Sequence, residues 1–180
     1  MHPRTEHPTG TPRQGRHDWS PWCSPWRVAI VVGFGLVLIR PAVVQAKTFA
    51  CHGGDVQCLI AAITEANASK KKNTIQLEAG TYTLVDIDNS TDGANGLPSI
   101  TGNLTIQGAG ADLTTIERHV NAPCFRPLHV GATGVLTLAR LTVTGGLNTS
   151  DNGGGGLHNH GGRVTMTQTT FTGNASDPFI

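Results

Sequence analysis

The chain has few charges and few aromatic residues, which narrows the classes of protein it can belong to. Only 14% of its 180 residues are charged, 5% are aromatic, and the formal net charge is +1. Beyond residue 46, eight Lys and Arg residues stand against ten Asp and Glu residues. The chain therefore lacks the basic surface that binds nucleic acid, and we expect no nucleic-acid partner.

The chain also lacks an apolar run long enough to span a bilayer. The run that follows Arg27 covers residues 28–39, which is 12 residues, whereas a spanning helix needs about 20. A short apolar core behind a basic residue is typical of a signal peptide, and small residues near Ala46 offer a cleavage site. We predict a leader and signal peptide over residues 1–46, and export to the extracellular space or the cell surface, with an uncleaved signal anchor as the alternative. No membrane contact is expected beyond the leader.

Cysteine is scarce, with four residues in the chain. Cys51 and Cys58 enclose a short loop that contains two glycines. Because an exported protein meets an oxidising compartment, we predict a disulfide between these two residues. Cys124 is then left over, either free and buried or paired elsewhere.

Glycine, in contrast, is abundant, with 23 residues. A short segment of alternating apolar and polar residues that is followed by glycine recurs along the chain. It occurs at residues 104–108, 141–146 and 170–174. Alternating apolar and polar residues put one face of a strand inside and the other in water. The last two copies align without gaps at a separation of 28 positions, pairing Leu136 with Val164, Leu138 with Met166 and Val143 with Phe171. A constant separation of this size favours a solenoid of stacked coils over a β-sandwich.

The same alternation predicts nine strands and two long loops. The strands are expected at residues 74–78, 81–85, 104–107, 114–117, 125–130, 135–138, 141–144, 164–167 and 170–172, and the loops at 86–96 and 145–162. The residues expected to face inward are Ile75, Leu77, Tyr82, Leu84, Leu104, Ile106, Ile116, Leu128, Val130, Leu136, Leu138, Val143, Val164, Met166 and Phe171.

One segment has the period of a helix instead. Asp55 is a good N-cap residue, and apolar residues follow it at helical spacing from Val56 to Ala66. We predict a helix of about three turns within an N-terminal cap of residues 47–72. The first coil of a solenoid exposes apolar core unless such a cap covers it.

These observations together predict an all-β protein, a short parallel β-helix over residues 73–180 with an N-terminal capping helix. No polar cap follows the last repeat. An open coil at that end would expose apolar residues and an unpaired strand edge. We therefore expect a truncated solenoid, or self-association at the open C-terminal coil.

Three segments resemble exported bacterial right-handed parallel β-helix proteins, those related to the CSLREA-type and choice-of-anchor families with a pectin-lyase-like fold. Residues 54–67 resemble their N-terminal cap, residues 73–84 and 96–110 their first coils, and residues 153–159 the glycine-rich turn of later coils. Ile60 and Ala61 depart from the pattern, since they replace the Arg-Glu pair of the signature. The resemblance implies right-handed coils and export. It implies no activity, because these families are defined by their scaffold.

An acidic loop is the best cation candidate. Asp86, Asp88 and Asp92 precede Gly93, and carboxylates at this spacing can wrap oxygen ligands around Ca²⁺. The glutamate that ends an EF-hand loop is missing, so an Asx-rich loop without metal is the alternative. We expect no other cofactor.

A second metal candidate is the segment of residues 158–160. His158 and His160 would lie on one side of an extended segment and could hold Zn²⁺ with a third ligand. Glycines flank this segment on both sides, so a turn is the preferred interpretation, with Asn159 stacked on equivalent residues of neighbouring coils.

The predicted function is a non-enzymatic one. Strands with outward Thr and Asn suit contact with a surface glycan or a protein, so we expect a binding or scaffolding role at the cell surface. The alternative is a carbohydrate-active enzyme, a polysaccharide lyase or a glycosidase, which truncation would inactivate. Its first candidate residues are Arg140 and Glu117.

Overall fold

The structure of the protein is a computed structural model that describes residues 45–69, 71–149 and 153–176. The predicted leader, residues 1–46, lies almost wholly outside the described residues. Within the described segments, no helix is both long and apolar enough to cross a membrane.

The single helix of the described residues is α1 (Val56–Ala68). It begins where the sequence predicts, because Asp55 caps it: Oδ1 of Asp55 accepts a hydrogen bond of 2.9 Å from the backbone N–H of Cys58. The buried face of α1 consists of Leu59, Ala62, Ile63 and Ala66. These residues form one stripe, so the helix prediction is confirmed.

The rest of the described chain consists mostly of short strands joined by loops. The strands are β1 (Thr48–Cys51), β2 (Lys72–Leu77), β3 (Gly80–Leu84), β4 (Asn103–Gln107), β5 (Thr114–Arg118), β6 (Leu128–Val130), β7 (Val135–Thr144), β8 (Leu147–Asn148), β9 (Leu157–Asn159), β10 (Arg163–Thr172) and β11 (Ala175–Ser176). Every pairing between these strands is parallel.

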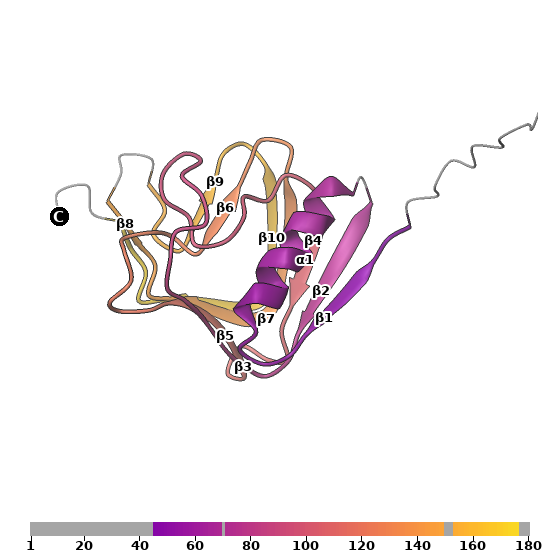
Figure 1. Ribbon diagram of the computed structural model, residues 1–180, viewed down its shortest axis with the longest axis horizontal. Helices are drawn as coiled ribbons and strands as arrows, with labels where there is room; N and C mark the ends of the chain where they lie inside the picture. Colours follow the sequence, from indigo (N-terminus) through magenta and orange to yellow (C-terminus); the bar gives the residue numbers. More distant parts are fainter. Residues whose placement is uncertain (1–44, 70, 150–152, 177–180) are drawn as a thin grey trace, which may run out of the picture. The chain divides into compact units, whose positions relative to one another are not determined.

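Seven of the strands make one curled sheet (Figure 1). Its order is β1-β2-β4-β7-β5-β3, and β10 also pairs with β7. The first half of β7 pairs with β4 and its second half with β5, so β7 belongs to both sides of the bend. The bend falls at Arg140, which has φ 57°, and β10 bends at Gln168, which has φ 50°.

The strands stack in register, and their apolar residues form continuous columns. One column is Phe49, Ile75, Ile106, Leu138 and Met166, and another is Tyr82, Ile116, Val143 and Phe171. The three residue pairs predicted at a separation of 28 positions are all strand partners of β7 and β10. The parallel all-β architecture is therefore confirmed.

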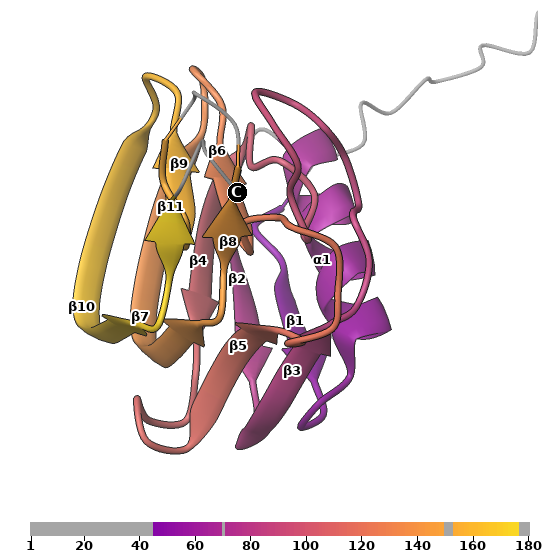
Figure 2. The ribbon, with the colours of Figure 1, turned by 90° about the vertical axis from the view of Figure 1, so that its left-hand side faces the viewer.

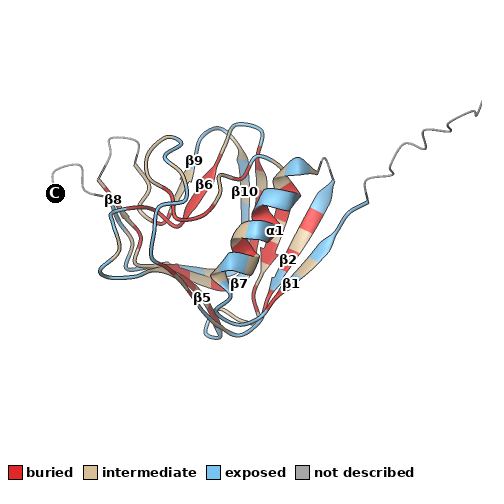
Figure 3. Ribbon diagram, in the orientation of Figure 1, coloured by how far each residue is buried: buried red, intermediate tan, exposed pale blue. Residues whose placement is uncertain are grey.

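The two ends of this stack differ (Figure 2). Helix α1 covers one end, whereas β10 lies at the other end and pairs only with β7 among the described strands. Buried residues alternate with less buried ones along the inner strands (Figure 3), but β10 contains no buried residue. Met166 lies in the inward column, as predicted, but is 48% exposed, because no further strand of the described residues covers it.

The strand and core predictions differ from the structure in a few further places. Residues 135–144 form one bent strand rather than two, because pairing with β10 continues on both sides of the left-handed residue at the bend. The strand predicted at 125–130 is shorter. The core also contains residues that strand alternation does not indicate, namely Leu97, Ile100, Phe125 and Leu141.

Candidate functional site: a histidine cluster and a threonine face

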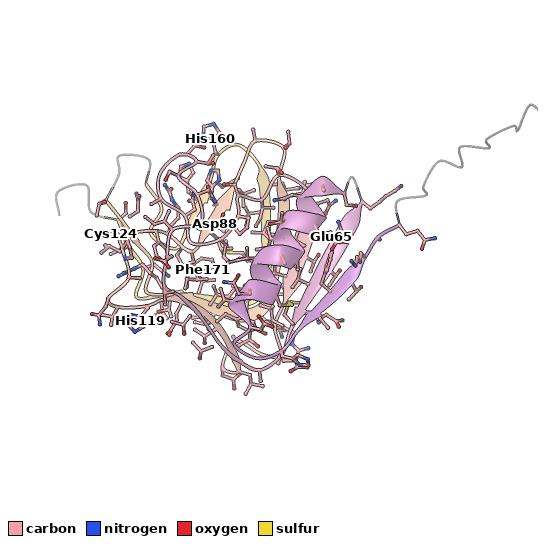
Figure 4. The ribbon with its side chains drawn as sticks, viewed as in Figure 1. Glu65, Asp88, His119, Cys124, His160 and Phe171 are labelled. Atoms are coloured by element: carbon pink, nitrogen blue, oxygen red, sulfur yellow. A yellow bond between two sulfur atoms is a disulfide. The ribbon has the colours of Figure 1, made fainter. Side chains whose placement is uncertain are left out.

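Four ionisable side chains from three distant parts of the chain meet at one edge of the described unit. We call Asp92, His129, His158 and His160 the histidine cluster. Asp92 lies in the loop between β3 and β4, His129 and His158 are partners on the β6–β9 pair, and His160 follows β9. Figure 4 shows His160 at the rim of the molecule.

Asp92 is the centre of the histidine cluster. Its Oδ2 lies 3.2 Å from Nε2 of His129 and 3.4 Å from Nδ1 of His160. The ring of His158 stacks on that of His129, with 5.6 Å between the centroids and 11° between the planes. Two imidazoles thus contact one carboxylate oxygen, and the third imidazole stacks on one of them.

His129 is fully buried, unlike the other members of the histidine cluster. Burial lowers its pKa, because it removes water from the charged ring, while the charge of Asp92 acts in the opposite direction. Its Nδ1 lies 2.8 Å from Oγ of Ser99. Its Nε2 has no hydrogen-bond partner, because the contact with Asp92 has the distance of an ion pair without hydrogen-bond alignment.

The backbone at Asp92 has an uncommon conformation and a hydrogen bond to a buried side chain. Asp92 has φ 52°, in the left-handed region that non-glycine residues rarely adopt. Its carbonyl oxygen accepts a hydrogen bond from the buried guanidinium of Arg126. Burial lowers the pKa of Arg126, and the charge of Asp92 acts against this shift.

The carboxylates predicted to bind calcium do not gather around one point. Among the described residues, no three His, Cys, Asp or Glu side chains are arranged as a metal site. Asp86 and Asp88 line a shallow groove beside Val56 and Ile60 of α1, whereas Asp92 faces the imidazoles. Calcium binding by Asp86, Asp88 and Asp92 stays a prediction.

The three cysteines of the described residues fall into a bonded pair and a single thiol. Cys51 and Cys58 form a disulfide, with 5.6 Å between their Cα atoms, which ties β1 to α1. Cys124 is an unpaired, exposed thiol rather than a buried one.

The two residues first suspected of catalysis have separate structural contacts. Glu117 accepts a hydrogen bond of 2.9 Å from the hydroxyl of Thr83, its strand partner. The guanidinium of Arg140 donates to the carbonyl oxygen of Ala109. The structure does not bring these two side chains together as an ion pair.

A second candidate surface is a column of threonines on the outer side of the curled sheet. Thr48, Thr74, Thr105, Thr137 and Thr165 occupy equivalent positions on β1, β2, β4, β7 and β10. We call this column the threonine face. Adjacent strands are about 4.7–4.9 Å apart, so the hydroxyls repeat at that spacing. Within the described part of the chain, none of the five hydroxyls hydrogen-bonds to another protein group.

The column beside the threonine face is also uncharged. It consists of Ala50, Gln76, Gln107, Ala139 and Thr167. These two columns therefore offer hydroxyls and amides that both donate and accept hydrogen bonds, and neither column carries a charge.

Comparison with known proteins adds no further identification. No family model, no curated protein and no solved structure matches this chain. The candidate sites therefore depend on their geometry alone.

His129 is the member of the histidine cluster that the sequence did not predict. Asp92 and His160 are 37 and 31 positions away from it, and no local motif connects them. One signal was available, since His129 and His158 are 29 positions apart, close to the separation of the aligned strands. A search for histidines at the repeat period would have paired them.

Proposed function

We propose that this protein is an exported, short right-handed parallel β-helix that acts as a binding scaffold for a neutral, hydroxyl-rich polymer such as a surface glycan. The threonine face carries the proposal. A ligand with regularly repeating hydroxyls can satisfy a row of protein hydroxyls that is itself regularly spaced.

The β-helix interpretation is supported by the parallel pairing of strands at regular sequence separations, from β4 through β7 to β10. Crossover connections between parallel strands are almost always right-handed. Export is supported by the disulfide between Cys51 and Cys58, because disulfides persist in oxidising compartments.

The absence of charge on the threonine face distinguishes between classes of ligand. A uronate polymer or a nucleic acid would call for basic residues. On one side, glutamine and alanine flank the central positions Thr74, Thr105 and Thr137. The column on the other side consists of Lys72, Asn103, Val135 and Arg163, so its positive charges lie at its two ends. A neutral polymer matches this surface best.

Two single substitutions test the proposal. Thr105→Lys places a charged stem in the middle of the threonine face. Thr115→Lys is the matched control, because Thr115 is also a half-buried, outward threonine of an inner strand, β5, but lies on the other side of the bend. Co-sedimentation with insoluble neutral polysaccharides, cellulose, chitin and β-1,3-glucan, measures the bound fraction.

We expect the full chain to bind at least one of these polymers. Thr105→Lys should weaken that binding about tenfold, which corresponds to one or two lost hydrogen bonds. Thr115→Lys should leave the affinity within twofold of the parent chain. Equal loss in both variants, or no binding of any neutral polymer by the unmodified chain, would contradict the proposal.

A further inference from the structure

The hydrogen bonds around Ser99 determine which nitrogen of His129 carries a proton. Oδ1 of Asn89 accepts from the backbone N–H of Thr91, and Nδ2 of Asn89 donates to the carbonyl oxygen of Leu97. Backbone groups have unambiguous roles, so the orientation of this amide is settled. The hydroxyl of Ser99 lies 3.0 Å from Oδ1 of Asn89, which can only accept, so Ser99 donates its one proton there.

Ser99 must therefore accept a hydrogen bond from Nδ1 of His129, 2.8 Å away. In its neutral form the ring carries one proton, so Nε2 of His129 then has a lone pair. That lone pair is fully buried, has no hydrogen-bond partner, and faces a carboxylate oxygen at 3.2 Å. Two acceptors face each other where a cation between them would stabilise both.

We propose that Asp92, His129 and His160 bind Zn²⁺ through Oδ2, Nε2 and Nδ1, respectively. This site is independent of the glycan-binding proposal. Zinc prefers imidazole nitrogen and carboxylate oxygen at about 2.0–2.1 Å, and two ligand atoms of a tetrahedral site then lie about 3.3–3.4 Å apart. The observed separations from Oδ2 of Asp92 are 3.2 Å to His129 and 3.4 Å to His160.

The surroundings of the three ligands have the supporting contacts of a metal site. The N–H at Nδ1 of His129 is held by Ser99, which orients Nε2 towards the metal position. Arg126 donates to the main-chain oxygen of Asp92 and leaves Oδ2 available. The left-handed backbone at Asp92 is the kind of strain that is concentrated at functional sites.

The three ligands are not yet arranged around one metal position in the described residues, so binding requires a local adjustment. His160 can supply it, because its side chain is 59% exposed and able to change rotamer. It borders a shallow depression lined by Ala132, His158 and Gly161, from which water would complete the coordination.

The test is a Zn²⁺ titration of the full chain carrying Cys23→Ser and Cys124→Ser, since free thiols bind zinc themselves. A chelating indicator dye competes for the metal, and thermal melting with and without Zn²⁺ gives a second readout. We expect one site, and a melting temperature that rises with Zn²⁺ because the metal binds the folded state. Asp92→Asn and His129→Gln should each weaken Zn²⁺ binding at least 30-fold, and His160→Gln about tenfold.

Two other histidines provide matched controls. His52 also has a carboxylate oxygen at 3.2 Å, that of Glu78, but its side chain is 87% exposed. His119 lies well apart from His160, at the lower left of the view whereas His160 is at the top (Figure 4). His52→Gln and His119→Gln should change the affinity less than twofold.

Asp92→Asn and His160→Gln alter side chains at least one-third exposed, so they test the site even if His129→Gln fails to fold. Unchanged Zn²⁺ affinity in these two variants would place the metal on other histidines and overturn the proposal. Absence of a Zn²⁺-dependent melting shift in the parent chain would overturn it as well.

Discussion

Strands β7 and β10 have matching patterns of apolar and polar residues, yet only β7 contains buried residues. They are aligned residue by residue at a separation of 28 positions, and both bend at a non-glycine residue with positive φ. Leu138 of β7 is completely buried, whereas its partner Met166 on β10 is 48% exposed. Among the described strands, β7 has neighbours on both sides and β10 on one. Burial in a stack therefore depends on the neighbours of a strand rather than on its own pattern.

The largest expected effect comes from truncating the core residue on each strand. Leu138→Ala should lower the free energy of unfolding by about 3 kcal/mol, because it removes buried methyl groups and leaves a cavity. Met166→Ala should lower it by less than about 1 kcal/mol, because the side chain is already half in water. Urea denaturation of the two variants and the parent chain measures the difference.

An equal decrease in the free energy of unfolding from both substitutions would contradict the difference in burial between the two strands. It would mean that a partner covers the outer edge of β10 in solution, which the predicted self-association at the open coil would provide. In that case the effect of Met166→Ala should decrease as the protein is diluted.

The glycine that follows each strand gives the next largest effect. Gly145 has φ 71°, and a Cβ there would lie 2.7 Å from the carbonyl oxygen of Arg118. Gly173 has φ 59°, but its nearest neighbour would be the hydroxyl of Thr144 at 3.2 Å. We expect Gly145→Ala to cost about 2 kcal/mol, from backbone strain and a clash, and Gly173→Ala about 1 kcal/mol, from strain alone.

Thermal unfolding of the two alanine variants under the same conditions provides the measurement. A larger melting shift for Gly173→Ala than for Gly145→Ala would show that the coil around β10 is packed as tightly as the coil around β7.

The smallest effect is expected at the bends themselves. Gln168→Gly should raise the free energy of unfolding by about 0.5 kcal/mol, because glycine adopts positive φ without steric cost but loses more chain entropy on folding. Arg140→Gly should be close to neutral, because the same relief is offset by the lost hydrogen bond from the guanidinium to Ala109. Calorimetric melting temperatures resolve the two variants, and a clear gain from Arg140→Gly would show that this hydrogen bond contributes nothing.

Much of the architecture could be predicted because it is encoded in local patterns. Asp55 and the apolar stripe of α1 specify a capped helix, and alternation specifies the strands of the curled sheet. The two-residue strands β8 and β11 were not predictable, because two residues show no period. β1 was missed as well, since its burial depends on α1 and β2, which lie elsewhere in the chain.

The histidine cluster shows the opposite case. The sequence placed Asp92 in a carboxylate loop with Asp86 and Asp88 because the three are close along the chain. In the structure, Asp92 lies beside His129 instead, whereas Asp86 and Asp88 line the groove beside α1.

By itself, the amino-acid sequence determined the capped helix, the alternating strands and the register at which strand phrases repeat. These depend on interactions between residues that are near each other or one period apart. Only the tertiary structure decided which copy of a repeated strand pattern is buried, and which side chains meet in the histidine cluster. Both depend on what lies across the stack, where loops of unequal length bring together residues whose separation along the chain carries no pattern.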